Sequence, residues 1–392
     1  MTVDAGTPEE AARVRALHAL NVLDTPKEER YDRVVRIAQQ VFGVKAAAVN
    51  LIDADRQFTK AETGLDGLVH AARTDSLCAR TVEADAPLVV PDAVVEARFA
   101  GSAFIAGPDP VRFYAGHPLH APGGEPVGSL CLVDDRPREL DARERRLLAE
   151  MAGWVERELA AQDEMDRAAQ VHRLIMPQST PRLDGYELAG RCTPTRDLGG
   201  DFYDWFPLGD QLQVNVADVM GKGVPAALLA SSARTALRGA SGFLGLPEAV
   251  DEAAATIAPV LEEAGAFVTA ICVRLDPGTG GLRCVDAGHG LGAIYRPDGG
   301  YRRLRYSGPP IGVLPGLRWE AHDDVLAPGE TLVVVSDGFL DYFSDDTAAI
   351  RAAAQLMADT ADPQEFVDRA TAFALERGRE DDVTVVALHR RP

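Results

Sequence analysis

The chain has 392 residues, of which 46% are hydrophobic and 26% charged, and its formal net charge is -20 at pH 7. This length suffices for two or three domains with complete cores, and the composition is that of a protein that folds in water. The acidic surplus argues against sequence-independent nucleic-acid binding, which rewards Lys and Arg, and disfavours binding to anionic membrane surfaces.

Three further features of the sequence predict a cytoplasmic protein. No uncharged apolar run approaches the length of a membrane span. The N-terminus, MTVDAGTPEEAARVR, is acidic and helical in pattern, unlike a basic and then apolar export signal. The cysteines form no CxxC pair, so we expect reduced thiols with buried, apolar roles. They are Cys78, Cys131, Cys192, Cys272 and Cys284.

The front third of the chain reads as helices around strands. A Thr-Pro-Glu-Glu sequence at residues 7–10 has the pattern of a capped helix start and predicts a helix to about Leu23. Thr25-Pro26 repeats this pattern, and Gly43 is expected to end the second helix. Strand-like segments follow: KAAAVNLID, PLVVPDA, FYAGHPL and GSLCLVD. Together these elements predict an α+β domain of the size of a sensor module.

A long helix is predicted from a cap at Asp141 to the first helix breaker, Pro177. With Leu148 at an a position, its heptad a and d positions are apolar at both ends and polar in the middle. This pattern is typical of a two-stranded parallel coiled coil, which would make the protein a dimer with a switchable linker. The alternative is a single helix that lies on one of the chain's own domains. The a and d residues are Leu148, Met151, Val155, Glu158, Gln162, Met165, Ala169, His172 and Met176.

Residues 177–392 contain many strand-like segments, several of them joined by turns with glycine. Between them, helices are predicted to begin at Pro225, Pro247 and Asp362. This order predicts a sheet-on-sheet core flanked by helices. The strand-like segments are LQVNVAD, AFVTAICVRLD, GLRCVDAGH, GAIYRPDGGYRRL, ETLVVVSDG and DVTVVALHR. The expected domains are therefore residues 1–140, a helical linker at 141–176, and residues 177–392.

Four aspartates in this last part lie at predicted strand ends or tight turns, next to glycine or a second acid. They are Asp201 in GGDFYD, Asp218 in ADVMGKG, Asp337 in VVVSDGF and Asp381 in EDDVTVV. Carboxylates that converge repel one another unless cations lie between them, so we predict divalent metal ions with oxygen ligands. Hydrolysis by a metal-activated water is the chemistry that suits such a site. The alternative is a set of ordinary turn aspartates.

The ordered motifs GGDFYD, ADVMGKGVPAALL, DAGHG, GPPIGV, SDGFLD and DDVTVV resemble the metal-dependent protein phosphatase (PPM) superfamily, in its bacterial SpoIIE-like branch. The resemblance implies an α-β-β-α sandwich and two Mn²⁺ or Mg²⁺ ions. It implies that Asp218 bridges the two ions and that the carbonyl of Val219 binds one of them. Asp337 and Asp381 would hold the second ion, and Asp201 would lie at the outer edge around the first.

Some neighbouring positions depart from this family pattern or remain open. Met220 stands where the eukaryotic branch has a histidine that is proposed as a general acid. Arg196 and Lys222 are possible phosphate contacts, although Lys222 also fits a solvated loop lysine. His289 is expected to make a structural hydrogen bond, and Asp204 is expected to be structural.

The front third resembles a GAF domain over about residues 15–160. The motifs are LDTPKEERYDRVVRIAQQVFGV, LIDADRQFTKAETGL, RTDSLCARTV, VVPDAVVEARF, VRFYAGHPL and GSLCLVDDRPREL. GAF domains bind cyclic nucleotides, bilins, haem or other small molecules, or only dimerise, so no ligand is assigned. Cys78 is expected to be buried and apolar and not a bilin attachment site. Four charged residues either line a polar pocket or lie on the surface; they are Arg56, Lys60, Arg73 and Asp75.

The resemblances together predict a metal-dependent serine/threonine protein phosphatase controlled by its GAF domain through the linker helix. Its substrate would be a phosphorylated regulatory protein, such as an anti-anti-sigma factor. One alternative is a catalytically weak, phosphatase-like scaffold gated by a GAF ligand, which the acidic residues at all metal-ligand positions disfavour. Another is a phosphohydrolase of small molecules, which the shallow cleft expected of this fold disfavours.

Overall fold

A computed structural model describes residues 7–65, 70–99, 102, 105, 110–360, 362–377 and 381–392. The chain divides into two compact units between Arg167 and Ala168, and each is described by itself. Among the described residues, no helix is both long and apolar enough to cross a membrane.

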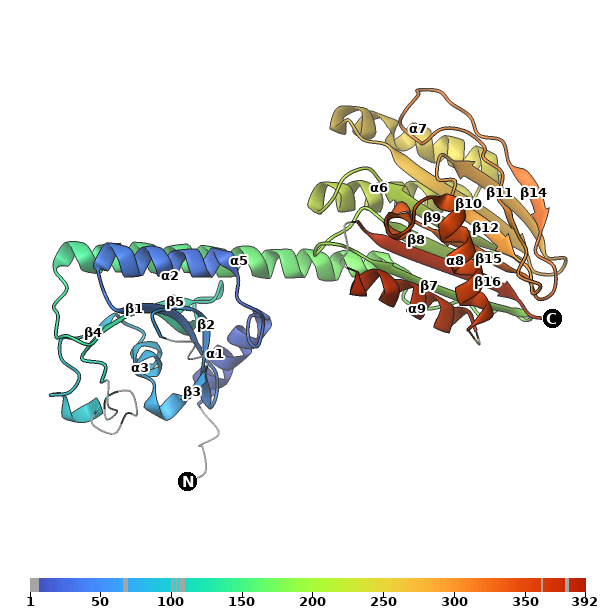
Figure 1. The fold of residues 1–392 in the computed structure, drawn as a ribbon. Helices are drawn as coiled ribbons and strands as arrows, with labels where there is room; N and C mark the ends of the chain where they lie inside the picture. The colour runs from blue at the N-terminus through green and yellow to red at the C-terminus, as the bar shows by residue number, and fades with distance from the viewer. Residues whose placement is uncertain are drawn as a thin grey trace. The chain divides into compact units, whose positions relative to one another are not determined.

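The first unit is built on a six-stranded antiparallel sheet in the order β3-β2-β1-β6-β5-β4. One face packs against α1, α2 and the first half of α5, and the other face packs against α3 (Figure 1). This is the α+β domain that the sequence predicts. Its helices are α1 (Pro8–Ala19), α2 (Glu29–Phe42) and α3 (Leu77–Ala84), with 3₁₀ turns η1 (Arg73–Asp75) and η2 (Ala97–Phe99). Its strands are β1 (Ala46–Ile52), β2 (Arg56–Thr63), β3 (His70–Ala72), β4 (Leu88–Val90), β5 (Phe113–His120) and β6 (Pro126–Asp134).

One of the two predicted helix starts in this unit is confirmed and the other is wrong. The Thr7 hydroxyl accepts a hydrogen bond from the Glu10 backbone, as the capping pattern predicts. By contrast, α2 begins only at Glu29, because the Thr25 hydroxyl is engaged elsewhere. It donates to the carbonyl of Val22 and accepts from the buried ammonium of Lys60. Gly43 ends α2 in the left-handed conformation (φ 57°), as expected.

The long helix α5 (Ala142–Ile175) follows the predicted cap, where the Asp141 carboxylate accepts from the Arg143 and Glu144 backbone. The structure gives the first part of its expected coiled-coil seam another role. Leu148, Met151 and Val155 are at most 2% exposed and belong to the core of the first unit. This part of α5 therefore packs on the chain's own domain, as the alternative interpretation predicts. A coiled coil with a second chain stays a prediction for the rest of α5.

The second unit is an α-β-β-α sandwich of two five-stranded antiparallel sheets, as predicted (Figure 1). The sheet β14-β11-β10-β9-β8 is covered by α6 (Val224–Ser241) and α7 (Leu246–Ala264). The sheet β13-β12-β15-β16-β7 is covered by α8 (Asp346–Ala358) and α9 (Pro363–Glu376). Apolar side chains of both sheets fill the space between them.

The strands of the second unit are β7 (Tyr186–Thr193), β8 (Phe202–Leu208), β9 (Gln211–Val219), β10 (Val268–Asp276), β11 (Gly281–Ala287), β12 (Gly292–Tyr295), β13 (Tyr301–Arg303), β14 (His322–Val325), β15 (Thr331–Val335) and β16 (Val383–Arg390). A 3₁₀ turn, η3 (Asp337–Tyr342), joins β15 to the segment before α8.

Candidate metal centre

Two of the four aspartates lie side by side at one end of the sheet that contains β8 and β9. Strands β8 and β9 are antiparallel, and Phe202 at the start of β8 pairs with Ala217 near the end of β9. Asp201 precedes that pair and Asp218 follows it, so the register brings the two carboxyl groups together. The two groups interact, because burial and then the charge of Asp218 raise the pKa of Asp201.

The other two aspartates lie at one end of the sheet that contains β15 and β16. Asp337 follows β15 and Asp381 precedes β16, and these two strands pair through Val335 and Val385. The charge of Asp381 raises the pKa of Asp337, and the charge of Asp337 raises that of Asp218. The four carboxyl groups therefore form a chain of electrostatic contacts, in which Asp201 is coupled to Asp218, and Asp218 to Asp337 and Asp381.

Burial and mutual repulsion make this group of acids unfavourable when it is fully charged. Asp201 is 1% exposed, and burial, followed by the charge of Asp218, raises its pKa well above the usual range. Burial, followed by the charge of Asp337, raises the pKa of Asp218 to about 7. Burial also raises the pKa of Asp337, with a second contribution from Asp381. A cation among these groups would lower their free energy.

Two observations show that the residues suit a metal ion. The buried Oδ2 atom of Asp201 has no hydrogen-bond partner, which is costly for a carboxylate without a ligand. The backbone of Gly200 lies so close to the Val219 carbonyl oxygen that a Cβ there would stand 2.6 Å from it. Only glycine leaves that oxygen uncovered. Carboxylate and carbonyl oxygens are the ligands that Mg²⁺ and Mn²⁺ prefer.

The donor set is nevertheless not assembled into a coordination shell. Within the described ranges, no three His, Cys, Asp or Glu side chains form a group that could hold an ion as they stand. Lys222 contributes to this arrangement, since its Nζ lies 2.9 Å from Asp381 Oδ2. The aspartates would have to draw together around an ion, and Lys222 would have to release one carboxylate oxygen.

Asp382 organises the site, although it is not among the residues that the sequence predicts there. Its buried carboxylate accepts hydrogen bonds from the backbone of Thr195 and Gly200, both at 2.7 Å. Its backbone carbonyl accepts from the Ser336 hydroxyl at 3.2 Å. Asp382 thus connects the segments that carry three of the four aspartates. The available signal was the pair of adjacent acids before β16, of which only one can point toward the site.

Ser336 and Gly338 maintain the same connection from the side of β15. The fully buried Ser336 hydroxyl also accepts from the Thr384 backbone at 2.9 Å, so it joins β15 to β16 beyond their last paired residues. A Cβ on Gly338 would lie 2.1 Å from the carbonyl oxygen of Asp382. The glycine after Asp337 is therefore needed for close approach of the two segments.

Asp204 has the structural role that was expected of it. Its carboxylate is fully buried and accepts from Arg238 at 2.7 and 2.9 Å and from Arg234 at 3.1 Å. Both arginines belong to α6, the helix that follows the glycine-rich loop after Asp218. The ion pairs therefore hold α6 against β8.

The two candidate phosphate contacts lie beside the same loop. Arg196 is exposed, and its guanidinium Nη1 stands 3.9 Å from the position of a Cβ on Gly223. Lys222 is also exposed and pairs with Asp381. Met220 is 44% exposed, and its thioether has no proton to donate.

His289 makes structural hydrogen bonds, as expected. Its Nε2 lies 2.9 Å from the Val335 carbonyl, which can only accept, so Nε2 carries the proton. Its Nδ1 then accepts from the Thr269 hydroxyl at 2.9 Å. Burial lowers the pKa of His289 to about 4, so the ring is neutral and ties β15 to β10.

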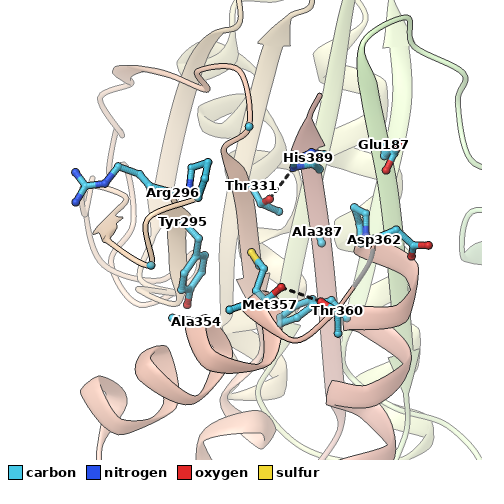
Figure 2. A pocket seen from close by; sticks show the side chains of 16 residues that line it. Glu187, Tyr295, Arg296, Thr331, Ala354, Met357, Thr360, Asp362, Ala387 and His389 are labelled. Atoms are coloured by element: carbon cyan, nitrogen blue, oxygen red, sulfur yellow. Dashed lines mark hydrogen bonds between the residues drawn. The ribbon is translucent and has the colours of Figure 1, made fainter. Parts of the chain in front are cut away.

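A cavity of about 220 Å³ lies elsewhere in this unit, between the second sheet and the helices α8 and α9 (Figure 2). Tyr295, Met357 and His389 are among the side chains that line it. His389 lies near the end of β16, whereas Asp381 precedes its start, so roughly 25 Å of strand separates them. The cavity contains none of the four aspartates, and we place the candidate site at the aspartates.

The charged residues considered for a GAF pocket are mostly engaged in local pairs. Arg56 makes two hydrogen bonds to Asp24. Arg73 pairs with Glu10, and Lys60, which is 1% exposed, donates to Thr25 and to the carbonyl of Pro26. These contacts anchor the segments before β1. For Asp75, the structure shows its backbone carbonyl accepting from the Ser102 hydroxyl.

Two family models match the chain: the GAF domain over residues 26–159, and Stage II sporulation protein E (SpoIIE) over residues 209–391. The cyclic di-GMP phosphodiesterase PA2567 of Pseudomonas aeruginosa is 32% identical over 130 residues, which are 33% of this chain and 22% of that protein. The phosphoserine phosphatase RsbU of Bacillus subtilis is 24% identical over 176 residues, which are 45% of this chain and 52% of that protein. The solved SiaA-PP2C domain of Pseudomonas aeruginosa is 26% identical, with a TM-score of 0.49, over 58% of this chain and 96% of that chain. The chain thus spans about half or less of these curated relatives.

Proposed function

Since this chain joins a GAF domain to a SpoIIE-type domain of the PPM phosphatase superfamily, we propose that it is a metal-dependent serine/threonine protein phosphatase. The observation that carries this proposal is the convergence of four aspartates from two sheets, with raised pKa values and an unpartnered oxygen on Asp201. Such a group is unfavourable without cations and suits divalent ions.

We assign the aspartates unequal roles. Asp218 would bridge two Mn²⁺ or Mg²⁺ ions, and the Val219 carbonyl would bind one of them. Asp337 and Asp381 would hold the other ion, with Asp201 at the rim of the first. When bound, such ions supply an activated water and neutralise charge on the phosphoryl oxygens.

The chain's own residues around this site would bind and orient the phosphate. The exposed guanidinium of Arg196 can bind two phosphate oxygens at once. Lys222 would leave Asp381 and bind the phosphate or protonate the leaving group. Its side-chain ammonium, on the loop that follows Asp218, can do either. Asp382 and Ser336 would hold the aspartate segments in register through the hydrogen bonds described above.

The substrate that fits best is a phosphorylated regulatory protein, such as an anti-anti-sigma factor. The name of RsbU, a phosphoserine phosphatase, supports phosphoserine as the group that is cleaved. Three apolar side chains in the loop and helix that follow Asp218 are 38–64% exposed and offer contact to a protein more than to a small metabolite; they are Met220, Val224 and Leu228.

We further propose that residues 1–140 sense a signal, that residues 141–176 transmit it, and that residues 177–392 carry the activity, in the cytoplasm. A homodimer through α5 would use the predicted seam positions that lie outside the first unit's core and stay partly exposed, among them Gln162, Met165 and His172. The ligand of the GAF domain, if it has one, is unassigned.

The test is phosphate release from a phosphoserine peptide by purified protein with MnCl₂. We expect Asp218→Asn and Asp337→Asn to lose activity by at least about a hundredfold, because each removes a proposed metal ligand. Asp210→Asn, an exposed aspartate in the β8–β9 turn, is the matched control and should retain full activity. An inactive wild type, or undiminished rates in both variants, would contradict an enzymatic role and favour the scaffold alternative.

The substrate class needs a separate experiment. A panel of phosphoproteins, phosphopeptides and small phosphate esters should show higher kcat/KM for the protein substrates. A pull-down with the Asp218→Asn variant, followed by mass spectrometry of phosphorylated partners, would identify the regulatory protein. A higher kcat/KM for small esters would instead support a small-molecule phosphohydrolase.

A further inference from the structure

Two cysteines of the first unit share one hydrogen-bond donor. The Asn50 amide nitrogen lies 3.2 Å from Cys78 Sγ and 3.3 Å from Cys131 Sγ. Cys78 lies near the start of α3, Cys131 lies in the central strand β6, and each is only 3% exposed. Because both sulfur atoms contact the same nitrogen, the two thiols lie side by side. This pair is a cluster of nucleophilic side chains for which the phosphatase proposal has no use.

Both cysteines are buried in the apolar cluster between the sheet and α3, as expected, and polar groups in addition reach their sulfur atoms. The Asn50 carbonyl oxygen accepts from Thr59 at 2.7 Å, which fixes the amide so that its NH₂ group faces the sulfur atoms. The Tyr114 hydroxyl lies 3.4 Å from Cys78 Sγ. The fully buried Ser129 hydroxyl also lies close enough to help lower the pKa of Cys78. An inert buried thiol needs none of these groups, whereas a thiolate is stabilised by such donors.

The two thiols differ in acidity. A hydrogen bond from Cys131 is the largest of the effects that lower the pKa of Cys78, and it outweighs the opposing effect of burial. The same interaction raises the pKa of Cys131 well above its usual range. The start of α3 adds a partial positive charge beside Cys78. Cys78 therefore has the character of the attacking thiolate, and Cys131 keeps its proton.

A small cavity lies against the pair. It has a volume of about 50 Å³, and its lining includes Asn50, Tyr114 and both cysteines. A volume of this size admits about one to three molecules as small as water. It fits hydrogen peroxide and excludes bulky thiol reagents.

We propose that Cys78 and Cys131 are a peroxide-reactive dithiol that forms a reversible disulfide between α3 and β6. The Cys78 thiolate attacks one oxygen of hydrogen peroxide, the O–O bond breaks, and the released hydroxide takes a proton to leave as water. Cys131 then attacks the sulfur of the sulfenic acid. The S–O bond breaks, and the hydroxyl leaves as a second water with the Cys131 proton. Two thiols are oxidised while one peroxide is reduced. A dithiol such as dithiothreitol then reduces the disulfide to the two thiols and is itself oxidised to a disulfide.

The other buried cysteines provide an internal contrast. Burial raises the pKa of Cys272 and of Cys284 to about 12, so both remain protonated. They should react more slowly with peroxide than Cys78 does. All three cysteines are buried, so the difference in rate would come from the thiolate fraction.

The experiment exposes the full-length protein to hydrogen peroxide, blocks the remaining thiols after unfolding, and maps peptides by mass spectrometry. We expect a Cys78–Cys131 cross-link that dithiothreitol removes, formed at least about tenfold faster than any oxidation of Cys284. Cys131→Ser should stop at a Cys78 sulfenic acid, which dimedone traps when it is present as the protein is unfolded. Cys284→Ser is the matched control and should leave the cross-link unchanged. Absence of the cross-link in the wild type, or equal oxidation of Cys78 and Cys284, would overturn the proposal.

Two further variants test the cause of the reactivity. Asn50→Leu and Tyr114→Phe each remove a donor to sulfur, and each should slow Cys78 oxidation by about tenfold. Tyr114→Phe keeps the ring and so serves where Asn50→Leu fails to fold. An unchanged rate in a folded variant would contradict activation by these donors. No arm measures phosphate release, so this proposal and the proposed phosphatase function can fail separately.

Discussion

Replacing Asp218 by Asn should stabilise the metal-free second unit, although it destroys the proposed metal site. The pKa of Asp218 is raised from 3.8 to about 7, mainly by burial and then by the charge of Asp337. A carboxyl group whose pKa is higher in the folded state binds protons there that the unfolded chain has already released. Its contribution is therefore most favourable below about pH 4, is lost as the pH rises toward about 7, and is constant at higher pH.

The size of this effect follows from the shift. About three pKa units at about 1.4 kcal/mol each correspond to about 4 kcal/mol at pH 8. This is an upper value, because Asp201 and Asp337 titrate together with Asp218, so part of the free-energy change belongs to their protonation. An Asn at position 218 has no charge to bury. The free energy of unfolding of the metal-free variant should therefore exceed that of the metal-free wild type by up to about 4 kcal/mol at pH 8, and by almost nothing at pH 4.

The assay is urea unfolding of EDTA-treated protein between pH 4 and pH 8. A Trp154→Phe background leaves Trp205 and Trp319 to report on the second unit, because Trp154 belongs to the first. Asp210→Asn in the same background controls for a general loss of negative charge. Added MnCl₂ should stabilise the wild type by about 2.7 kcal/mol at a hundredfold excess over Kd, and should stabilise the Asn variant far less. A variant that is no more stable than the wild type at pH 8, or equally more stable at pH 4, would refute the reasoning.

Three further outcomes are expected. Asp382→Ala leaves the Thr195 and Gly200 N–H groups unpaired, so it should lower the free energy of unfolding in urea by about 3–5 kcal/mol. It should also weaken Mn²⁺ binding, measured by calorimetry, at least tenfold, and a loss of stability with unchanged affinity would reject its positioning role. Asp204→Ala strands the α6 arginines that it pairs with and should cost about 3 kcal/mol with the metal-binding stoichiometry intact, so a lost ion would place Asp204 in the site instead. Leu148→Ala should destabilise the first unit by about 2–5 kcal/mol, and an effect below about 1 kcal/mol would contradict its burial there.

The sequence predicted the layers of the second unit and the place of its acids for one physical reason. Antiparallel strands alternate in direction, so an acid that ends one strand and an acid that precedes its neighbour meet at the same edge. Asp201 and Asp218 obey this rule through β8 and β9, and Asp337 and Asp381 obey it through β15 and β16. Asp382 escaped prediction because its role depends on backbone N–H groups nearly two hundred residues earlier in the chain.

Other features could not be predicted because the same pattern serves two structures. An apolar a and d series suits a partner helix and a domain surface equally well, and Leu148 and Val155 pack on the domain. The Thr25-Pro26 pattern fits a cap, but the Thr25 hydroxyl donates to Val22 and accepts from the buried ammonium of Lys60, which also pairs with Glu28. The polar setting of Cys78 is contributed by Asn50 and Tyr114, which lie 28 and 36 positions away from it in the chain.

The division of the four aspartates between two sheets has a consequence for ion choice. The sheets pack through side chains such as Trp205, Ile294 and Val334, so the volume of these residues sets the distance between the two pairs of carboxylates. Mn²⁺ is larger than Mg²⁺, and Mg²⁺ demands a stricter octahedral geometry. A bulkier or smaller interlayer residue, remote from the aspartates, would therefore shift the preference between the two ions. Relatives with the same acids could in this way diverge in metal selectivity through their cores alone.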